Sequence, residues 1–336
     1  MTDNYDGDNL EEKFKFFPNA RSVLALERSK NPDGQINIER LMTRLDGCMP
    51  YDFENKADNE LMLLLSEAKK CFVRRIQEAK ETKGHNDELV AFAHYCVNNR
   101  ITCITFNYDD VFDHSLWEVK KVTAFSEDIY YWHPDGGYGF FCRPSESCVR
   151  DTNAYMDQKL SMYLLKLHGS INWRIRRGFL PPYAIDSIVH HEPWLPCDPR
   201  FKPAPENINF HLEPDPFIVP PVLLKSALVE QPILRMVWSL AYKKLAQAGQ
   251  VVFIGYSLPV TDIASSFLFT ETLRNIPVSE IRVVNFAQDE ETIKEIQSAY
   301  RRVFPGLNDE QFYFRGALEW IKELMGTSNK TCEPST

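Results

Sequence analysis

Short apolar runs in this sequence are followed by polar residues of the kinds that act in catalysis and ligand binding. Asn107 and Asp109 follow one run, His168 follows a second, and Ser257 and Asp262 follow a third. An imidazole, whose ordinary pKa is about 6.5, can serve as a base at neutral pH. Each residue also has an ordinary explanation by itself, because Asn and Asp form turns and cap helices and a lone His is commonly a hydrogen-bonded core residue.

The runs themselves have the composition of strands buried on both faces of a parallel sheet. They are rich in Ile, Val, Leu and Phe and lack clean alternation: ITCITFN (101–107), YLLKLHG (163–169), QVVFIGY (250–256) and EIRVVNF (280–286). Helical spacing lies between them, notably at 233–248 and 290–300. An α/β sheet binds its ligands beyond the carboxyl ends of its strands, which is where the polar residues lie.

The rest of the chain divides by composition. Apolar residues at three-and-four spacing predict amphipathic helices at 36–45, 59–80 and 87–98. Prolines concentrated in 181–221 exclude long helices there, and 123–150 is a second irregular segment. We therefore expect a polar tail (1–20), a single domain (21–325) with a helical part (36–98) and a Pro-rich insertion (174–221), and a C-terminal tail (326–336).

Composition narrows the classes of function. The 336 residues carry a formal net charge of −9, which gives no global attraction for nucleic acid or an anionic membrane. The sequence has no apolar stretch that spans a bilayer and no signal peptide, so a cytoplasmic protein is expected. The eight cysteines form no C-x-x-C pair, which favours buried thiols over a zinc ribbon.

Three segments in order, TFNYD, KLHGSINW and FIGYSLPVTD, resemble the signature segments of the sirtuin-like (silent information regulator) superfamily, in particular its bacterial NAD-hydrolysing anti-phage branch. The similarity runs from about residue 36 to about residue 300. The resemblance implies a Rossmann-like doubly wound parallel sheet with helices on both faces. It also implies an NAD+ hydrolase that releases nicotinamide and ADP-ribose and depletes NAD as a defence effector.

The resemblance assigns roles to particular positions. His168 would be the general base, Asn107 would orient the ribose hydroxyls or the attacking water, and Asp109 would bind the carboxamide of nicotinamide. Gly255 and Ser257 would approach the phosphates of NAD. The other binding positions are Thr105, Phe106, Gly169, Ser170, Tyr256 and Asp262, the last favoured as a helix cap. NAD is thus expected as the substrate, without a metal.

Two departures from the family matter. The paired C-x-x-C motifs of the deacylating members are absent, which disfavours protein deacylation. The family's first strand and glycine-rich phosphate loop are also missing; the nearest candidate, Val23 to Lys30, has Glu27 and Arg28 where glycines would stand. Either this strand lies upstream of Met1 or the loop has degenerated. We therefore expect a pocket that is incomplete in this chain or closed by another chain.

Two alternatives stay open beside the hydrolase. One is a catalytically degenerate subunit that binds NAD or ADP-ribose within a larger defence complex. The other is a nuclease or other hydrolase with Asp109, Asp110, Asp113 and His114 on a metal ion. A homo-oligomer or a complex with a separate ATPase or sensor is expected, with no direct contact to nucleic acid or membrane. Trp238, Tyr242 and Phe267 lie on apolar helical faces and are expected in the core.

Overall fold

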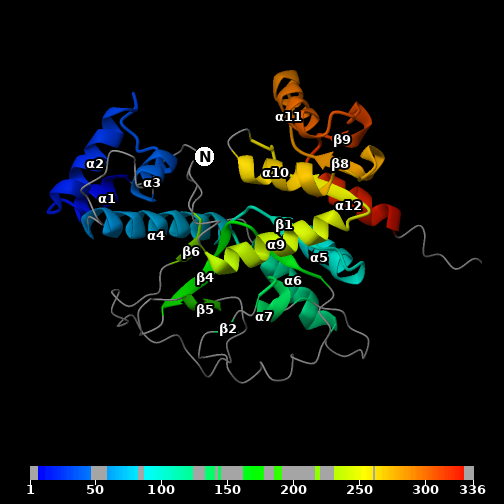
Figure 1. The fold of residues 1–336 in the computed structure, drawn as a ribbon, viewed down its shortest axis with the longest axis horizontal. Helices are drawn as coiled ribbons and strands as arrows, with labels where there is room; N and C mark the ends of the chain where they lie inside the picture. The colour runs from blue at the N-terminus through cyan, green and yellow to red at the C-terminus, as the bar shows by residue number, and fades with distance from the viewer. Residues whose placement is uncertain are drawn as a thin grey trace, which may run out of the picture.

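A computed structural model of the chain describes residues 7–46, 59–81, 87–123, 132, 134–140, 143–144, 162–177, 185–190, 216–219, 231–259 and 262–328. Figure 1 shows a group of N-terminal helices beside a larger part that holds the sheets and the remaining helices. The ends of both expected tails and most of the Pro-rich insertion lie outside the described residues.

The N-terminal helices pack around a core of their own. They are α1 (Gly7–Lys13), α2 (Pro18–Ser29), α3 (Ile38–Asp46) and α4 (Asn59–Glu81). Helical spacing brings apolar side chains onto one face of each helix, and the shared core includes Leu10, Phe14, Leu24, Leu41 and Leu64. The helices expected at 36–45 and 59–80 are confirmed as α3 and α4. Residues 7–20, assigned to a polar tail, instead contain α1 and bury three core side chains, Leu10, Phe14 and Ala20.

A first parallel pair of strands follows. β1 (Cys103–Thr105) pairs with β3 (Leu164–Lys166), and the register places Ile104 opposite Leu165. Helix α5 (Asp87–Asn98) precedes β1 and α6 (Val111–Thr123) follows it. Both strands lie within the apolar runs that predicted them.

A second parallel sheet has the order β7 (Val251–Ile254), β8 (Ile281–Val284) and β9 (Phe312–Tyr313). Helix α9 (Pro232–Ala246) leads into β7. α10 (Ile263–Thr272) and the 3₁₀ turn η4 (Val278–Glu280) connect β7 to β8. α11 (Glu290–Val303) and η5 (Asp309–Gln311) connect β8 to β9, and α12 (Ala317–Ser328) follows.

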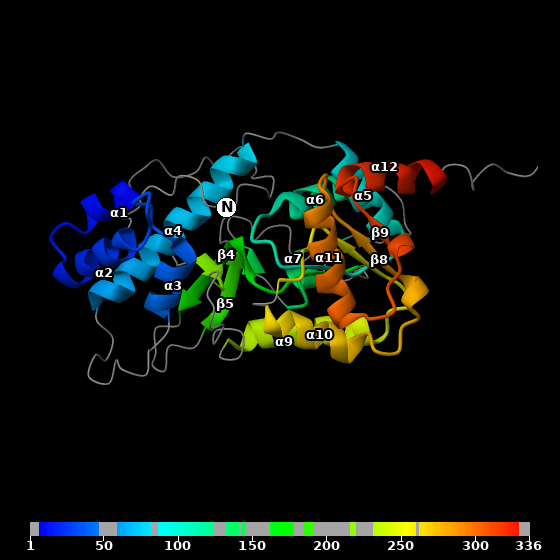
Figure 2. The same ribbon diagram turned by 90° about the horizontal axis from the view of Figure 1, so that it is seen from above.

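The described part of the Pro-rich insertion contributes strands. β4 (Gly169–Arg177) lies between β5 (Ile185–His190) and β6 (Pro216–Ile218) and is antiparallel to both. The short β2 (Arg143–Pro144) pairs with β5. Figure 2 shows α4 running from the N-terminal helices toward this sheet. Val73 of α4 packs there against Ile171 and Ile218.

The main hydrophobic core joins the two parallel sheets to their helices. It includes Leu165 of β3, Phe253 of β7 and Val283 of β8. The irregular segment 123–150 contributes Trp132 and Tyr138, which are fully buried, and a single short turn of helix, α7 (Pro134–Gly137). This segment is therefore part of the core where it is described.

The chain is thus a mixed α/β protein in which helices predominate and the parallel sheets are small. Among the described strands, none pairs with both β1 and β7, so the expected single sheet is divided into a two-stranded and a three-stranded part. The expectation that Tyr242 and Phe267 lie in the core is wrong, because they are 43% and 62% exposed. Trp238 packs partly against the core as expected. In the described portion, no helix combines the length and apolarity needed to cross a membrane.

Candidate functional site

The segments that follow β1, β3 and β7 meet around the ring of Phe106. This ring stacks on Tyr256 with centroids 4.7 Å apart and contacts the imidazole of His168 at 5.3 Å. Trp238 of α9 approaches the same ring at 6.4 Å and donates its indole N–H to the carbonyl of Leu167 at 2.9 Å. The structure therefore brings together residues from all three polar segments singled out in the sequence.

His168 lies directly beyond β3 and is only 7% exposed. Phe106 meets its imidazole edge-on, and the ring of Tyr108 lies on it at 6.0 Å in a stacked arrangement. The carbonyl of His168 accepts the N–H of Val219 at 2.8 Å, which fixes the backbone. The imidazole is thus held in an aromatic slot that excludes most water.

Asn107 lies at the exposed rim of this slot. Its backbone N–H donates to the hydroxyl of Thr105 at 3.1 Å. The next residue, Tyr108, is anchored by its hydroxyl, which donates to the carbonyl of Val219 at 2.7 Å. Both sequence neighbours of Asn107 contact the imidazole of His168, so the backbone of Asn107 passes beside this ring.

Asp109 has structural bonds of its own. Its Oδ1 accepts the N–H of Val111 at 3.1 Å, as a residue does before the first turn of a helix, and its carbonyl accepts a hydrogen bond from the ammonium of Lys166. The carboxylate therefore starts α6 from a fixed position beside the rim. The family resemblance assigned Asp109 to the carboxamide of nicotinamide. The cap uses only Oδ1 of the carboxylate, which leaves Oδ2 for that role.

Lys166, which sequence reasoning missed, organises the polar residues beneath the rim. Its ammonium is fully buried and lies 3.1 Å from Oδ2 of Asp113, and Tyr138 donates its hydroxyl to Asp113. Burial raises the pKa of Asp113, and the positive charge of Lys166 opposes that rise. The signal was present in the sequence, because a lysine inside the apolar run YLLKLHG requires a buried partner.

Gly169 and Ser170, assigned to ligand binding, have packing roles in the structure. Gly169 has φ +79°, and a Cβ there would stand 2.2 Å from the carbonyl oxygen of Phe217 in β6. Ser170 is fully buried, and its hydroxyl donates to the carbonyl of Tyr108 at 3.4 Å. These residues hold β4 against β6 and against the segment after β1.

Tyr256 and Asp262 form a pair beyond β7. The phenol of Tyr256 donates to Oδ2 of Asp262 at 3.0 Å. Burial raises the pKa of the Tyr256 phenol and the carboxylate of Asp262 adds to the rise, so the hydroxyl keeps its proton at neutral pH. Asp262 occupies the N-cap position of α10, as expected, but its side chain makes no capping bond to the helix and serves Tyr256 instead.

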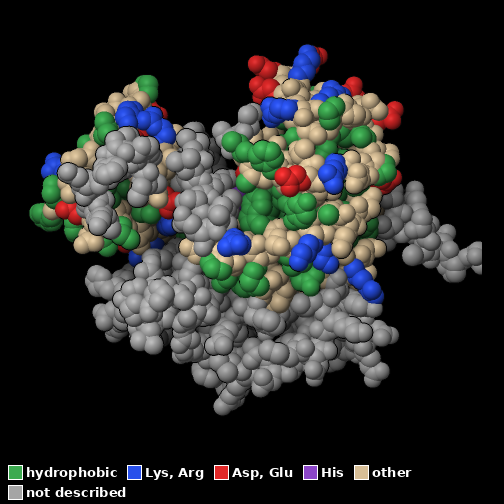
Figure 3. All heavy atoms as spheres, in the orientation of Figure 1, with side chains coloured by type: hydrophobic (Ala, Val, Ile, Leu, Met, Phe, Trp, Pro, Cys, Tyr) green, Lys and Arg blue, Asp and Glu red, His purple; other side chains and the backbone are tan. Residues whose placement is uncertain are grey.

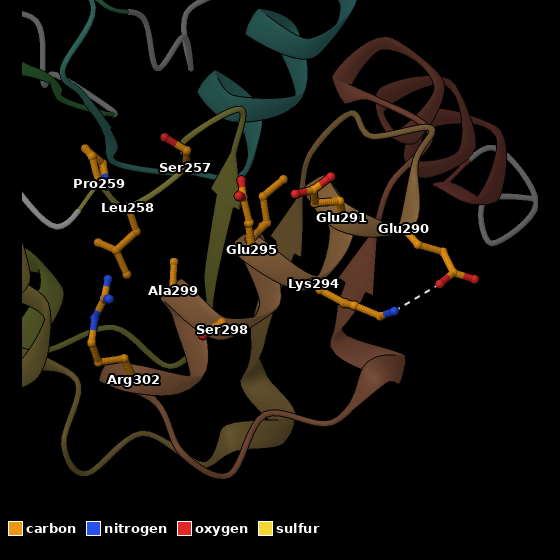
Figure 4. A pocket seen from close by; sticks show the side chains of 11 residues that line it. Ser257, Leu258, Pro259, Glu290, Glu291, Lys294, Glu295, Ser298, Ala299 and Arg302 are labelled. Carbon is orange, nitrogen blue, oxygen red and sulfur yellow. Dashed lines mark hydrogen bonds and ion pairs between the residues drawn. The ribbon is translucent and has the colours of Figure 1, made fainter.

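Gly255 and Ser257 are both exposed on this loop. Gly255 adopts φ +65° with open space around its missing Cβ. Figure 4 shows Ser257 at one end of an open groove between the loop and α11. The α11 side carries Glu290, Glu291 and Glu295 together with Lys294 and Arg302, so acidic groups outnumber basic ones in the groove.

The acidic residues considered as metal ligands make other interactions in the structure. Asp113 pairs with Lys166, and Oδ2 of Asp110 lies 3.3 Å from Nε2 of His114. Within the described ranges, no group of three His, Cys, Asp or Glu side chains has an arrangement that would hold a metal ion. Cys71, Cys96 and Cys103 are free thiols in the described part, while the other five cysteines lie outside it.

The segment nearest to a glycine loop, residues 23–30, lies in α2 of the N-terminal unit. Glu27 is buried there and pairs with Arg40 and Lys30, each at 3.4 Å. This segment is therefore part of helix packing and not a phosphate-binding turn.

Comparison with known proteins leaves the chain without an identified family. No protein-family model matches the sequence, and no curated protein is significantly similar to it.

Proposed function

We propose that the chain is a sirtuin-like NAD+ hydrolase of a Rossmann-like fold, with its site at the rim around Phe106. The observation that carries the proposal is the convergence of His168, Asn107 and the Gly255–Ser257 loop at the carboxyl ends of parallel strands. Parallel α/β sheets bind nucleotides at this edge. The resemblance of the same three segments to the sirtuin-like superfamily, in the same order, supplies the substrate and the defence role by NAD depletion.

The chemistry fits the residues present. Cleavage of the glycosidic bond sends its electron pair to the pyridinium nitrogen, so nicotinamide leaves neutral and the anomeric carbon takes on oxocarbenium character. His168 would then accept the proton of the water that attacks this carbon, giving ADP-ribose. Asn107 would orient that water or the ribose hydroxyls from the exposed rim. The aromatic slot of Phe106 and Tyr108 holds the imidazole in place.

Charge decides where the phosphates would bind. The first turn of α11 carries Glu290 and Glu291, which repel phosphate from the groove side of the loop. The first turn of α10 has no acidic residue, and its N-cap carries the single carboxylate of Asp262, which accepts a hydrogen bond from Tyr256, so α10 opposes phosphate less than α11 does. We therefore assign the phosphates to the exposed Gly255–Ser257 loop and the start of α10.

Replacement of the base tests the proposal. The His168→Ala variant should lose at least about a hundredfold in the rate of nicotinamide release, measured by chromatography of NAD+ incubated with purified protein. His94→Ala is the matched control, because His94 lies on α5 away from the rim and is half-buried. Equal turnover by the His168→Ala variant and the wild type would refute the assignment.

A second candidate is an NAD- or ADP-ribose-binding subunit without catalysis. It is favoured by Asp109 and Asp262, whose carboxylates already accept bonds within the chain. In that case NAD+ would quench Trp238 fluorescence saturably while no nicotinamide is released on prolonged incubation. Release that depends on His168 would exclude this candidate.

A further inference from the structure

Two thiols lie in contact where α5 meets β1. The Sγ atoms of Cys96 on α5 and Cys103 at the start of β1 are 3.9 Å apart, and both residues are free cysteines. Cys96 is fully buried in the main core, whereas Cys103 is half-buried at its border. A disulfide bond is about 2.05 Å long, so the two sulfurs need to approach by only about 2 Å to form one.

The turn between the two elements fixes this contact. Arg100 has φ +57°, in the left-handed region, at the position where many helices end in glycine. The N–H of Ile101 donates to the carbonyl of Cys96 at 2.9 Å, and the N–H of Arg100 donates to the carbonyl of Val97 at 3.2 Å. These two bonds form a Schellman motif, which turns the chain back at the end of α5. The contact of the thiols therefore rests on the backbone and not only on side-chain rotamers.

The strand side of the contact is fixed as well. The N–H of Cys103 donates to the carbonyl of Tyr163 at 2.8 Å, and the register pairs Cys103 with Leu164 of β3. The strand then continues into Phe106, whose ring stacks on Tyr256. A covalent bond at Cys103 would therefore tie the segment that leads to the rim to the end of α5.

The two thiols differ in reactivity. The contact with Cys103 and burial raise the pKa of the Cys96 thiol, so Cys96 keeps its proton at neutral pH. An oxidant reacts with the thiolate form of a cysteine and needs access to its sulfur. Because Cys103 is the more exposed of the two, it is the thiol that an oxidant in solution meets first.

We propose that Cys96 and Cys103 form a reversible disulfide when the protein is exposed to a peroxide. The thiolate of Cys103 attacks one oxygen of hydrogen peroxide, the O–O bond breaks and hydroxide leaves, which gives a sulfenic acid. The sulfur of Cys96 then attacks the sulfur of Cys103 and displaces hydroxide, which takes the thiol proton of Cys96 and becomes water. The two thiols lose two electrons, and the peroxide is reduced to water. The inference concerns the covalent state of the chain and does not depend on the proposed hydrolase.

Trypsin separates the two cysteines, which makes the bond easy to detect. It cleaves after Arg100, so Cys96 lies on the peptide 84–100 and Cys103 on the peptide 101–120, each without another cysteine. The full chain is treated with hydrogen peroxide, its remaining thiols are alkylated, and it is digested without reductant. Mass spectrometry should find the two peptides joined, about 2 Da lighter than their summed masses. Dithiothreitol added before alkylation should return two separate, alkylated peptides.

Peroxide also oxidises exposed methionines, which is a separate event. Figure 3 shows hydrophobic side chains gathered over α9 and α10, and Met236 of α9 is exposed. Conversion of methionine to its sulfoxide adds one oxygen and joins no peptides. Neither of the two cysteine peptides contains methionine, so their joining reports oxidation of the thiols alone.

Three variants assign the roles of the two thiols. Cys103→Ser should abolish the joined peptides and leave the shielded Cys96 free for alkylation after unfolding. Cys96→Ser should leave Cys103 as a sulfenic acid, which dimedone captures. Cys71→Ser is the control, because Cys71 packs in the core of the N-terminal helices, and it should give joined peptides as the wild type does.

Two results in the wild-type protein would overturn the proposal. One is that both cysteines remain alkylated at a peroxide concentration that oxidises Met236. The other is that Cys96 or Cys103 is joined to a different cysteine, in the same chain or in a second copy.

Discussion

Lys166 shows how a buried charge positions residues of the candidate site. Its ammonium reaches the carbonyl of Asp109 and the carboxylate of Asp113, which belong to the start of α6. A buried ion pair contributes little more to stability than a well-packed apolar pair, but removal of one partner leaves the other charge buried without a counter-charge. The pair therefore fixes α6, and with it Asp109, relative to β3.

Removal of this ammonium should be strongly destabilising. We expect Lys166→Met to lower the free energy of unfolding by about 3–5 kcal/mol at neutral pH, because Asp113 is left buried without a counter-charge. Urea unfolding followed by circular dichroism measures the change. The double variant Lys166→Met/Asp113→Leu removes both charges and should recover most of the loss; no recovery would mean that packing, not charge, accounts for it.

The pH dependence of the same variant has a defined sign. Burial raises the pKa of Asp113, and the variant lacks the positive charge that opposes this rise. The folded variant therefore binds a proton at a pH where the unfolded chain, with an Asp pKa of about 3.9, does not. Its stability falls as pH rises through this window. Unfolding curves should thus show that the loss of stability relative to the wild type becomes smaller as the pH is lowered toward about 3.9.

Two glycines give a matched test of how closely the strands β4 and β6 approach each other. Gly169→Ala should destabilise the protein by more than about 2 kcal/mol, because φ is +79° and the new Cβ would overlap the carbonyl oxygen of Phe217. Gly249→Ala is the control, with an ordinary φ and open space at its Cβ. Thermal unfolding of both variants compares them; a similar melting temperature would show that β4 and β6 do not approach this closely.

Elements were predictable where local pattern determines them. Apolar runs such as 250–256 became β7, and three-and-four spacing at 87–98 became α5. The pairing of the strands was not predictable, because apolar composition does not say which strands are neighbours; among the described strands, β1 pairs with β3 and β7 pairs with β8. Periodicity also places Phe267 on an apolar helical face without saying whether any element covers that face.

The candidate site was predictable only in its outline. The positions of polar residues after strands located His168 and Asn107 at one rim, since strand ends gather at one edge of a parallel sheet. Packing roles for Gly169 and Ser170 depend on β6, which lies far along the chain in an insertion that local pattern does not describe. Long-range contacts of this kind decide which residues support the rim.

At the scale of the whole molecule, α4 couples the N-terminal helices to the site. Its Phe72 meets the ring of Tyr108 edge-on at 5.3 Å, and Tyr108 stacks on His168. Its Val73 packs on Ile171 of β4 and Ile218 of β6. The helical unit is thus connected to the aromatic slot through one helix.

Truncation at this junction should weaken the whole fold. Ile171→Ala should cost about 2–5 kcal/mol in urea unfolding, because the side chain is buried between α4 and the sheet. Ile263→Ala, at a position 62% exposed, should change stability by about 0.5 kcal/mol or less. Equal effects of the two substitutions would mean that α4 does not pack on β4 in solution.

The divided sheet bears on how the chain folds while it is being synthesised. The N-terminal helices form their core from residues up to Cys71. β1 and β3 pair before α9 is made, and β7, β8 and β9 pair among later residues. No ladder between described strands has to join β1 to a strand that the ribosome adds much later. Contacts close in sequence form quickly, and domains fold as units from the N-terminus. The chain can therefore fold in three successive stages, and joining of the two parallel sheets becomes the last step.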